Sequence, residues 1–169
     1  MASDASRRPS FWGLMTFVVV LDRITKLLAE RMLGSGEVAA IAGDTVQLRL
    51  VHNLGAAFGL HLGPYSRWIF MGIAIVAVVF LYRMWKESDP ADRLRQYALG
   101  FVAGGAAGNL IDRFISARGV VDFIDVGVGA LRWPTFNIAD IAVSCGAVAL
   151  AFSLWREDVR RAAAVVPPA

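Results

Sequence analysis

The chain has 169 residues, of which 57% are hydrophobic and 18% are charged, and its net charge is +3. This charged fraction is below the roughly 25% of soluble domains, and the mean hydropathy is +0.55, so we expect a single-domain integral membrane protein. Its basic residues are spread among apolar runs, and it has one cysteine and two histidines. We therefore expect no nucleic-acid partner, no internal disulfide, no metal and no cofactor.

Four apolar segments predict four membrane-spanning helices in one domain covering residues 1–169. Each segment has about 18–20 residues, which is enough to cross a hydrocarbon core of about 30 Å. Polar or proline-containing sequences at both ends predict disordered tails at 1–9 and 160–169. The predicted spans are 11–28, 68–85, 94–113 and 136–155.

The first span places Asp22 and Lys26 four residues apart, on one face of a helix, where the two side chains can pair. Two interpretations stay open. The pair either stabilises the end of the helix or belongs to a polar face directed into a functional site.

The segment between the first two spans predicts two strands and an irregular turn. Residues 46–50 alternate apolar and polar side chains, as a half-buried strand does, and residues 38–42 can pair with them across Gly43 and Asp44. The sequence HNLGAAFG (52–59) then suits a turn with close backbone approach. The apolar residues Phe58, Leu60 and Leu62 indicate either a short segment on the membrane surface or an ordinary loop with buried side chains.

The third span carries Gly100, Gly104 and Gly108, one on every fourth residue. This small-xxx-small pattern lets membrane helices approach closely, and we expect it to serve packing inside the bundle. The span ends in three polar residues that can point one way from the helix end: Asn109, Asp112 and Arg113.

Two aspartates, Asp122 and Asp140, lie beside apolar runs at the edges of the last loop and the last span. An ionised carboxylate near lipid is costly, so each is a candidate functional residue. Brought together, the two could share one proton and activate water, as in aspartic proteases. The alternative is that they are helix caps. We expect Asp125 to be solvated in the loop and Cys145 to be a packed small residue.

Basic residues flank the predicted cytoplasmic ends of the spans, which favours both termini in the cytoplasm. In that topology the polar side chains named above gather near the outer membrane interface. Two other classes of protein stay open. A small ion- or proton-coupled transporter subunit would place charges near the midplane, with broken helices and an internal repeat. A non-catalytic membrane adaptor would tolerate loss of either aspartate.

Five sequence blocks together resemble those of bacterial lipoprotein signal peptidase, also called signal peptidase II. They are VLDRITK (20–26), HNLGAAFG (52–59), GGAAGNLIDR (104–113), GVVDFID (119–125) and FNIADIAVSCG (136–146). The resemblance implies a four-transmembrane-helix bundle with a small extracytoplasmic β-cradle and a short interfacial helix. It also implies an intramembrane aspartic endopeptidase of the bacterial inner membrane. Such an enzyme removes the signal peptide from prolipoproteins by cleaving just before a cysteine that carries a diacylglyceryl group.

By the same resemblance, Asp122 and Asp140 form the catalytic dyad, and neither a metal nor a cofactor is needed. The partners are diacylglyceryl-modified prolipoproteins and membrane lipids, and we expect a monomer. We expect the Arg113 side chain to pair with Asp112 or with a substrate carbonyl. The residues implied to bind substrate or orient the site are Asp22, Lys26, Asn53, Gly55, Asn109, Asp112, Arg113 and Asn137. Two positions depart from the family pattern without removing a polar group: His52 stands where an aromatic residue is common, and Ile111 where tyrosine is frequent.

Overall fold

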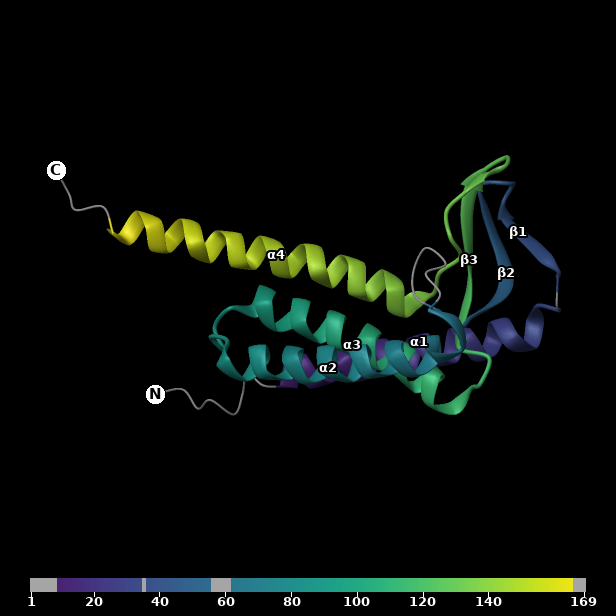
Figure 1. Ribbon diagram of the computed structural model, residues 1–169. Coiled ribbons are helices and arrows are strands. Elements are labelled where there is room, and N and C mark those ends of the chain that lie inside the picture. Colours follow the sequence, from purple (N-terminus) through teal and green to yellow (C-terminus); the bar gives the residue numbers. More distant parts are fainter. Residues whose placement is uncertain (1–8, 35, 56–61, 166–169) are drawn as a thin grey trace.

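The computed structural model describes residues 9–34, 36–55 and 62–165, which form long helices and a small sheet (Figure 1). The helices are α1 (Pro9–Met32), α2 (Ser66–Glu87), α3 (Arg93–Ile115) and α4 (Ile138–Val165), and a short 3-10 helix, η3 (Gly63–Tyr65), precedes α2. The strands are β1 (Val38–Ala42), β2 (Val46–Asn53), β3 (Val120–Val128) and β4 (Leu131–Arg132).

The helices are longer than the predicted spans. At its C-terminus α4 continues to Val165, so the prediction of a disordered tail from residue 160 is wrong for 160–165, and α1 already begins at Pro9. At its N-terminus α4 begins at Ile138 instead of 136, because the backbone of Phe136 pairs with Ile124 of β3. Residues 1–8, 166–169 and the predicted surface segment around Phe58 and Leu60 lie outside the described residues.

Glycines bring the helix axes close together, as the four-residue spacing predicts. A Cβ atom built on Gly104 would lie 2.8 Å from Val18 Cβ of α1, and one built on Gly108 would lie 2.6 Å from Asp22 Oδ2. Both distances are shorter than carbon contacts allow, so α1 can pack this closely against α3 only because these positions lack a side chain. The predicted packing role of the glycines inside the bundle is confirmed for these two contacts.

Substituting Gly105→Ala tests the closeness of α3 and α4. The added methyl group would collide with the Ala139 carbonyl oxygen and lie 2.8 Å from Val143 Cγ2. We expect the unfolding free energy in detergent micelles to fall by about 1–3 kcal/mol, the usual cost of overpacking. Gly72→Ala on α2 is the matched control, since a Cβ there meets nothing within 4 Å. Alanine is also the better helix former, so this variant should be at least as stable as the parent. Equal effects at both positions would contradict this packing argument.

The four strands form one antiparallel sheet in the order β1-β2-β3-β4. The predicted strand at 46–50 and its pairing with 38–42 are confirmed, with Val38 opposite Arg49 and Ala42 opposite Val46. The sheet stands at one end of the helix bundle, and the beginning of α1 and the end of α4 lie at the other end (Figure 1). Residues from both strand and helix termini therefore meet where the sheet joins the bundle.

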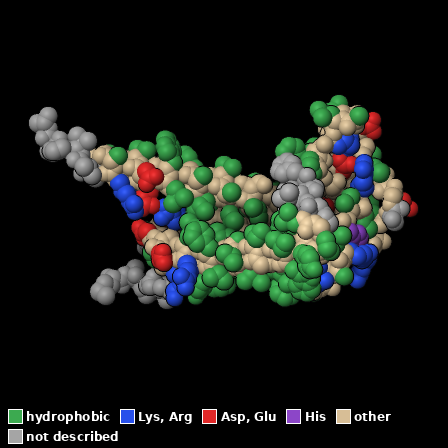
Figure 2. Space-filling view, in the orientation of Figure 1, with side chains coloured by type: hydrophobic (Ala, Val, Ile, Leu, Met, Phe, Trp, Pro, Cys, Tyr) green, Lys and Arg blue, Asp and Glu red, His purple; other side chains and the backbone are tan. Residues whose placement is uncertain are grey.

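The surface of the helices is apolar. Large side chains such as Phe17, Val76, Phe80 and Val148 are exposed, and Figure 2 shows hydrophobic side chains along the helices, with charged side chains gathered toward both ends. Within the described residues, two helical stretches, Gly63–Glu87 and Ile138–Ala163, are long and apolar enough to cross a membrane. This surface is typical of a membrane protein, since soluble proteins rarely expose apolar area so widely.

Candidate active site

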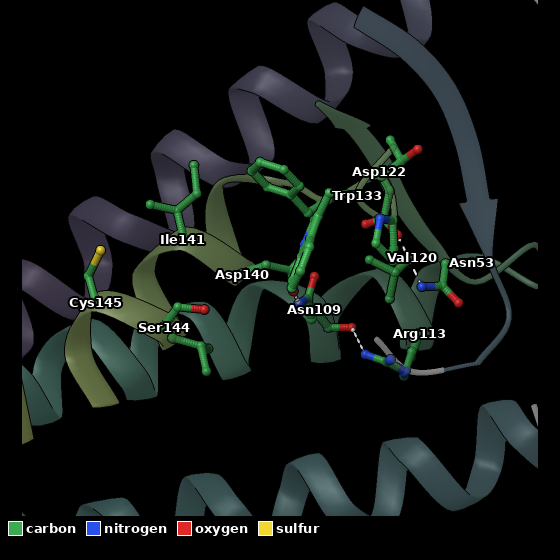
Figure 3. A pocket seen from close by; sticks show the side chains of 14 residues that line it. Asn53, Asn109, Arg113, Val120, Asp122, Trp133, Asp140, Ile141, Ser144 and Cys145 are labelled. Carbon is green, nitrogen blue, oxygen red and sulfur yellow. Dashed lines mark hydrogen bonds between the residues drawn. The ribbon is translucent and has the colours of Figure 1, made fainter. Parts of the chain in front are cut away.

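The structure brings Asp122 and Asp140 together at the junction of sheet and bundle. Asp122 lies on β3 and is 3% exposed, and Asp140 lies half-buried in the first turn of α4. Both line a cavity of about 480 Å³ that runs from the flank of α4, past Ile141, to Asn53 at the end of β2 (Figure 3). The two carboxylates, separated in the sequence by a hairpin, thus face one space.

One buried residue, Asn137, donates to both carboxylates. Its Nδ2 donates to Asp122 Oδ1 at 2.7 Å, and its backbone N–H donates to Asp140 Oδ2 at 3.1 Å. In return, Asn137 Oδ1 accepts from the Asp140 backbone N–H at 3.0 Å. This reciprocal pattern is a capping box, so Asp140 is a helix cap and a cavity-lining carboxylate at once. The capping role that the sequence left open for Asp140 is therefore confirmed, and it leaves the carboxylate at the cavity.

The remaining carboxylate oxygens accept from two further asparagines. Asn53 Nδ2 donates to Asp122 Oδ2 at 3.1 Å, and Asn109 Nδ2 donates to Asp140 Oδ1 at 2.9 Å. Each of the four oxygens thus accepts from an N–H group. This fixes the orientation of both carboxylates toward the cavity.

Burial raises the pKa of Asp122 to about 6, and the negative charge of Asp140 adds to this effect. The hydrogen bonds from Asn53 and Asn137 oppose the rise but do not cancel it. Up to about pH 6 most Asp122 carboxyls therefore hold a proton that an ordinary surface aspartate would have lost.

Behind the carboxylates lies a buried cation, Lys26. Its Nζ lies 2.8 Å from Asp22 Oδ2, 2.7 Å from Asp112 Oδ2 and 2.9 Å from Asn109 Oδ1. The predicted pairing of Asp22 with Lys26 is confirmed. Because Lys26 occupies the oxygen of the Asn109 amide, the NH₂ group of that amide is directed at Asp140. The first helix thus contributes to the orientation of a carboxylate on the fourth.

Arg113 does not pair with Asp112, which was the partner expected for it within the chain. Its guanidinium donates to the backbone carbonyls of Gly55, at 2.9 Å, and Asn109, at 3.1 Å, while Asp112 pairs with Lys26. The expectation of an Arg113–Asp112 pair is therefore wrong, because the two residues leave the helix on different sides. Arg113 also lines the cavity (Figure 3). Gly55, in turn, donates its N–H to Asn53 Oδ1 at 2.9 Å, which links the β2 end to the site.

Two expectations about neighbouring residues are wrong. Asp125 is not solvated: it is 2% exposed and lies 2.7 Å from Arg132 Nε and 2.9 Å from Arg49 Nη2. Cys145 is not a packed residue: it is exposed and lines the cavity together with its neighbour Ser144. Its place inside an apolar run gave no indication that this face of α4 borders the cavity.

The sequence also gave no indication of the cavity wall formed by the segment before α4. Trp133, Pro134, Thr135 and Phe136 all line the cavity. A second hollow of about 360 Å³ continues past Asp122 on the other side, between the end of β2 and Pro134 and Thr135. A Trp-Pro dipeptide in a loop is a weak signal, because it predicts a turn and not what the turn covers.

Comparison with known proteins identifies the family of this chain. A family model described as signal peptidase (SPase) II matches residues 14–156. The lipoprotein signal peptidase of Treponema denticola is 36% identical over 155 residues, covering 88% of this chain and 90% of that protein. That of Paraburkholderia phymatum is 37% identical over 146 residues, covering 85% and 86%.

Two solved structures of bacterial membrane enzymes have a similar fold. A bacterial membrane enzyme solved by the in meso method at 2.3 Å superposes with a TM-score of 0.79 at 27% identity, covering 88% of each chain. A second one, solved at 1.9 Å, gives 0.75 at 28% identity, covering 85% of this chain and 91% of that one. The chain therefore belongs to the signal peptidase II family of peptidases.

Proposed function

We propose that this chain is an aspartic endopeptidase in which Asp122 and Asp140 activate a water molecule. The observation that carries the proposal is the pairing of the two carboxylates through Asn137 at a shared cavity. The two lie in different environments, since Asp122 is buried on a strand and Asp140 is half-buried at the N-terminus of a helix. Such a difference separates an acid from a base in known carboxylate pairs.

In the reactive form of the enzyme Asp122 holds the proton and Asp140 is ionised. The N-terminus of α4 and the two N–H donors from Asn137 and Asn109 stabilise the negative charge on Asp140. Asp140 removes a proton from water as the water oxygen attacks the scissile carbonyl carbon, and Asp122 gives its proton to the carbonyl oxygen. A tetrahedral diol results. Asp140 then protonates the leaving amine, the C–N bond breaks, and a diol hydroxyl returns a proton to Asp122.

The proposed substrate is a prolipoprotein that carries a diacylglyceryl group on the cysteine following the scissile bond. Support comes from the relatives named lipoprotein signal peptidase and from the cavity itself, which runs along the apolar residues Ile141 and Val143 of α4. Each buried acyl CH₂ group contributes about 0.8 kcal/mol, so an apolar flank beside the dyad can add substantially to the binding of a lipidated cysteine.

We further propose that all four long helices cross the inner membrane, with both termini in the cytoplasm and the sheet outside. The start of α1 and the end of α4 lie at the same end of the bundle, opposite the sheet (Figure 1). α1 is less apolar than α2 because it carries Asp22 and Lys26, but both side chains are fully buried against α3 and α4 and face no lipid. The site then lies near the extracytoplasmic interface, and the enzyme acts as a monomer.

The direct test incubates the purified protein in detergent micelles with a prolipoprotein in two forms, with and without the diacylglyceryl group. We expect mass spectrometry to show cleavage just before the cysteine in the lipidated form and little or none in the other. Equal cleavage of both forms would show that the enzyme does not recognise the diacylglyceryl group. A folded protein that cuts neither form, while a second peptidase of the family cuts the lipidated one, would reject the activity.

The pKa of Asp122 predicts a pH dependence of cleavage. As the pH rises through about 6, Asp122 loses its proton, both carboxylates become negative and the acid of the mechanism is lost. We therefore expect kcat/KM, which reports the free enzyme, to fall above about pH 6. The corresponding fall in kcat should lie at higher pH, because bound substrate excludes water and favours the neutral form.

The variant Asn53→Ala tests whether Asp122 is the titrating group. The hydrogen bond from Asn53 lowers the Asp122 pKa, so its removal should move the fall in kcat/KM to higher pH. A fall that stays at the same pH in this variant would assign the titration to another group.

A further inference from the structure

We propose that Asp125 and Arg132 position the outer wall of the substrate channel, and this inference rests on the proposed peptidase function. The wall is the segment Trp133–Thr135, which lines the cavity at the dyad. Pro134 and Thr135 also line the second hollow, as do Asn53 and Asp122. A peptide whose scissile bond lies at Asp122 must therefore pass between this wall and the end of β2.

Among the described residues, backbone hydrogen bonds hold the wall at both of its ends. Trp133 N–H donates to the Val126 carbonyl at 2.8 Å, and Phe136 N–H donates to the Ile124 carbonyl at 3.0 Å. Two residues of the wall, Pro134 and Thr135, thus stand opposite one residue of β3, which is Asp125. This is the geometry of a β-bulge, a device that redirects side chains next to active sites, and Pro134 suits it because proline has no N–H to donate.

Asp125 and Arg132 fasten this bulge to the sheet. Asp125 Oδ1 lies 2.7 Å from Arg132 Nε, and the carboxylate is buried. Arg132 also donates to the Asp44 carbonyl at 2.8 Å and to the Asp125 carbonyl at 3.3 Å, so it joins β4 to β3 and to the β1–β2 turn. Since Arg132 directly precedes Trp133, the ion pair determines where the wall leaves the sheet.

Asp125 makes a second ion pair that provides a matched control. Arg49 on β2 lies 2.9 Å from Asp125 Oδ2, but its side chain is 42% exposed and it is remote in sequence from the wall. Removing Arg49 breaks an ion pair to the same carboxylate and leaves Arg132 in place. Loss of sheet stability and loss of wall position can thus be told apart.

The first measurement compares the kinetics of Arg132→Gln, Asp125→Asn and Arg49→Gln. Asp125 and Arg132 touch neither the dyad nor the scissile bond, so Arg132→Gln and Asp125→Asn should raise the KM for prolipoprotein by about 10-fold and change kcat less than about twofold. Arg49→Gln should raise KM less than about threefold. An equal effect of Arg49→Gln, or a fall in kcat without a change in KM, would overturn the proposal.

The second measurement does not depend on activity. Thr135→Cys is introduced into a Cys145→Ser background, and the rate of maleimide labelling is measured in micelles. With Arg132→Gln added, labelling should accelerate at least fivefold because the wall detaches, and with Arg49→Gln added it should stay unchanged. An unchanged rate with Arg132→Gln rejects the positioning role even if the protein cleaves prolipoprotein. An accelerated rate in a protein that never cleaves supports the role and rejects the proposed function alone.

Discussion

Asp122→Asn and Asp140→Asn are each expected to lower the rate of prolipoprotein cleavage by about 10⁴-fold or more, and the double variant should be no slower than either single one. The reason is that the carboxylates act as a unit, so that losing one partner removes the benefit of the other. An asparagine at 122 cannot donate the proton that the carbonyl oxygen requires, and one at 140 cannot remove a proton from water. The measurement is single-turnover cleavage of a lipidated substrate in micelles.

Folding must be measured beside these rates. Both oxygens of each carboxylate accept hydrogen bonds, so the NH₂ group of a new asparagine will face an N–H donor, which costs about 1–3 kcal/mol. The rates should therefore be compared at a temperature where thermal unfolding shows every variant folded. Asp44→Asn, in the exposed β1–β2 turn, should cleave at the parent rate. Substantial cleavage by a folded Asp122→Asn or Asp140→Asn protein would refute the dyad.

Lys26→Met is expected to reduce the unfolding free energy by about 3–5 kcal/mol, the largest stability effect that we anticipate. Lys26 is fully buried between Asp22 and Asp112, so its removal leaves the Asp22 carboxylate without a cation and leaves Asp112 only the longer contact with Arg23. Adding Asp22→Asn should recover part of the loss, because one buried charge is then neutral. Denaturant unfolding in mixed micelles measures all three proteins.

Arg23→Met provides the control for charge at this position of the bundle. Arg23 also contacts Asp112, but at 3.4 Å and with a side chain that is 35% exposed, so its removal should cost less than about 1 kcal/mol. If Lys26→Met were no more harmful than Arg23→Met, the buried network would not be a principal source of stability.

Local patterns were sufficient to predict the parts of the fold that depend on near neighbours. The alternation at 46–50 identified β2, the spacing of Asp22 and Lys26 identified their ion pair, and the glycines of α3 identified a packing face. Each of these features follows from a side-chain periodicity, which is two residues in a strand and three to four residues in a helix. The choice of Asp122 and Asp140 as the catalytic pair came from family resemblance, since either could have been a cap.

The failures have a common physical cause, which is that burial is decided by distant segments. Asp125 was expected to be solvated because it falls in the loop between two predicted spans, but Arg49 and Arg132 from two other strands enclose it. Cys145 looked packed because its neighbours in sequence are apolar, but the cavity borders that face of α4. No local pattern reports a contact made from the other side of the sheet or bundle.

The structure also argues against a transporter. That alternative required broken helices and charges near the middle of the membrane. Within the described residues α1 to α4 are each continuous, and the buried charged side chains gather where the bundle meets the sheet. An adaptor without activity would need no such orientation of two carboxylates by three asparagines.

The adjacency of Asp22 and Lys26 has a consequence for how the protein is made. Because the two lie on successive turns of one helix, Lys26 has a counter-ion within α1 itself and can enter the bilayer already paired, before α3 has been synthesised. Asp112 and Asn109 reach Lys26 later, and Asp140 is oriented only after α4 has followed. In the proposed topology the newborn peptidase is therefore inert until its last helix is in place, so a ribosome-bound fragment cannot cleave neighbouring proteins in the membrane.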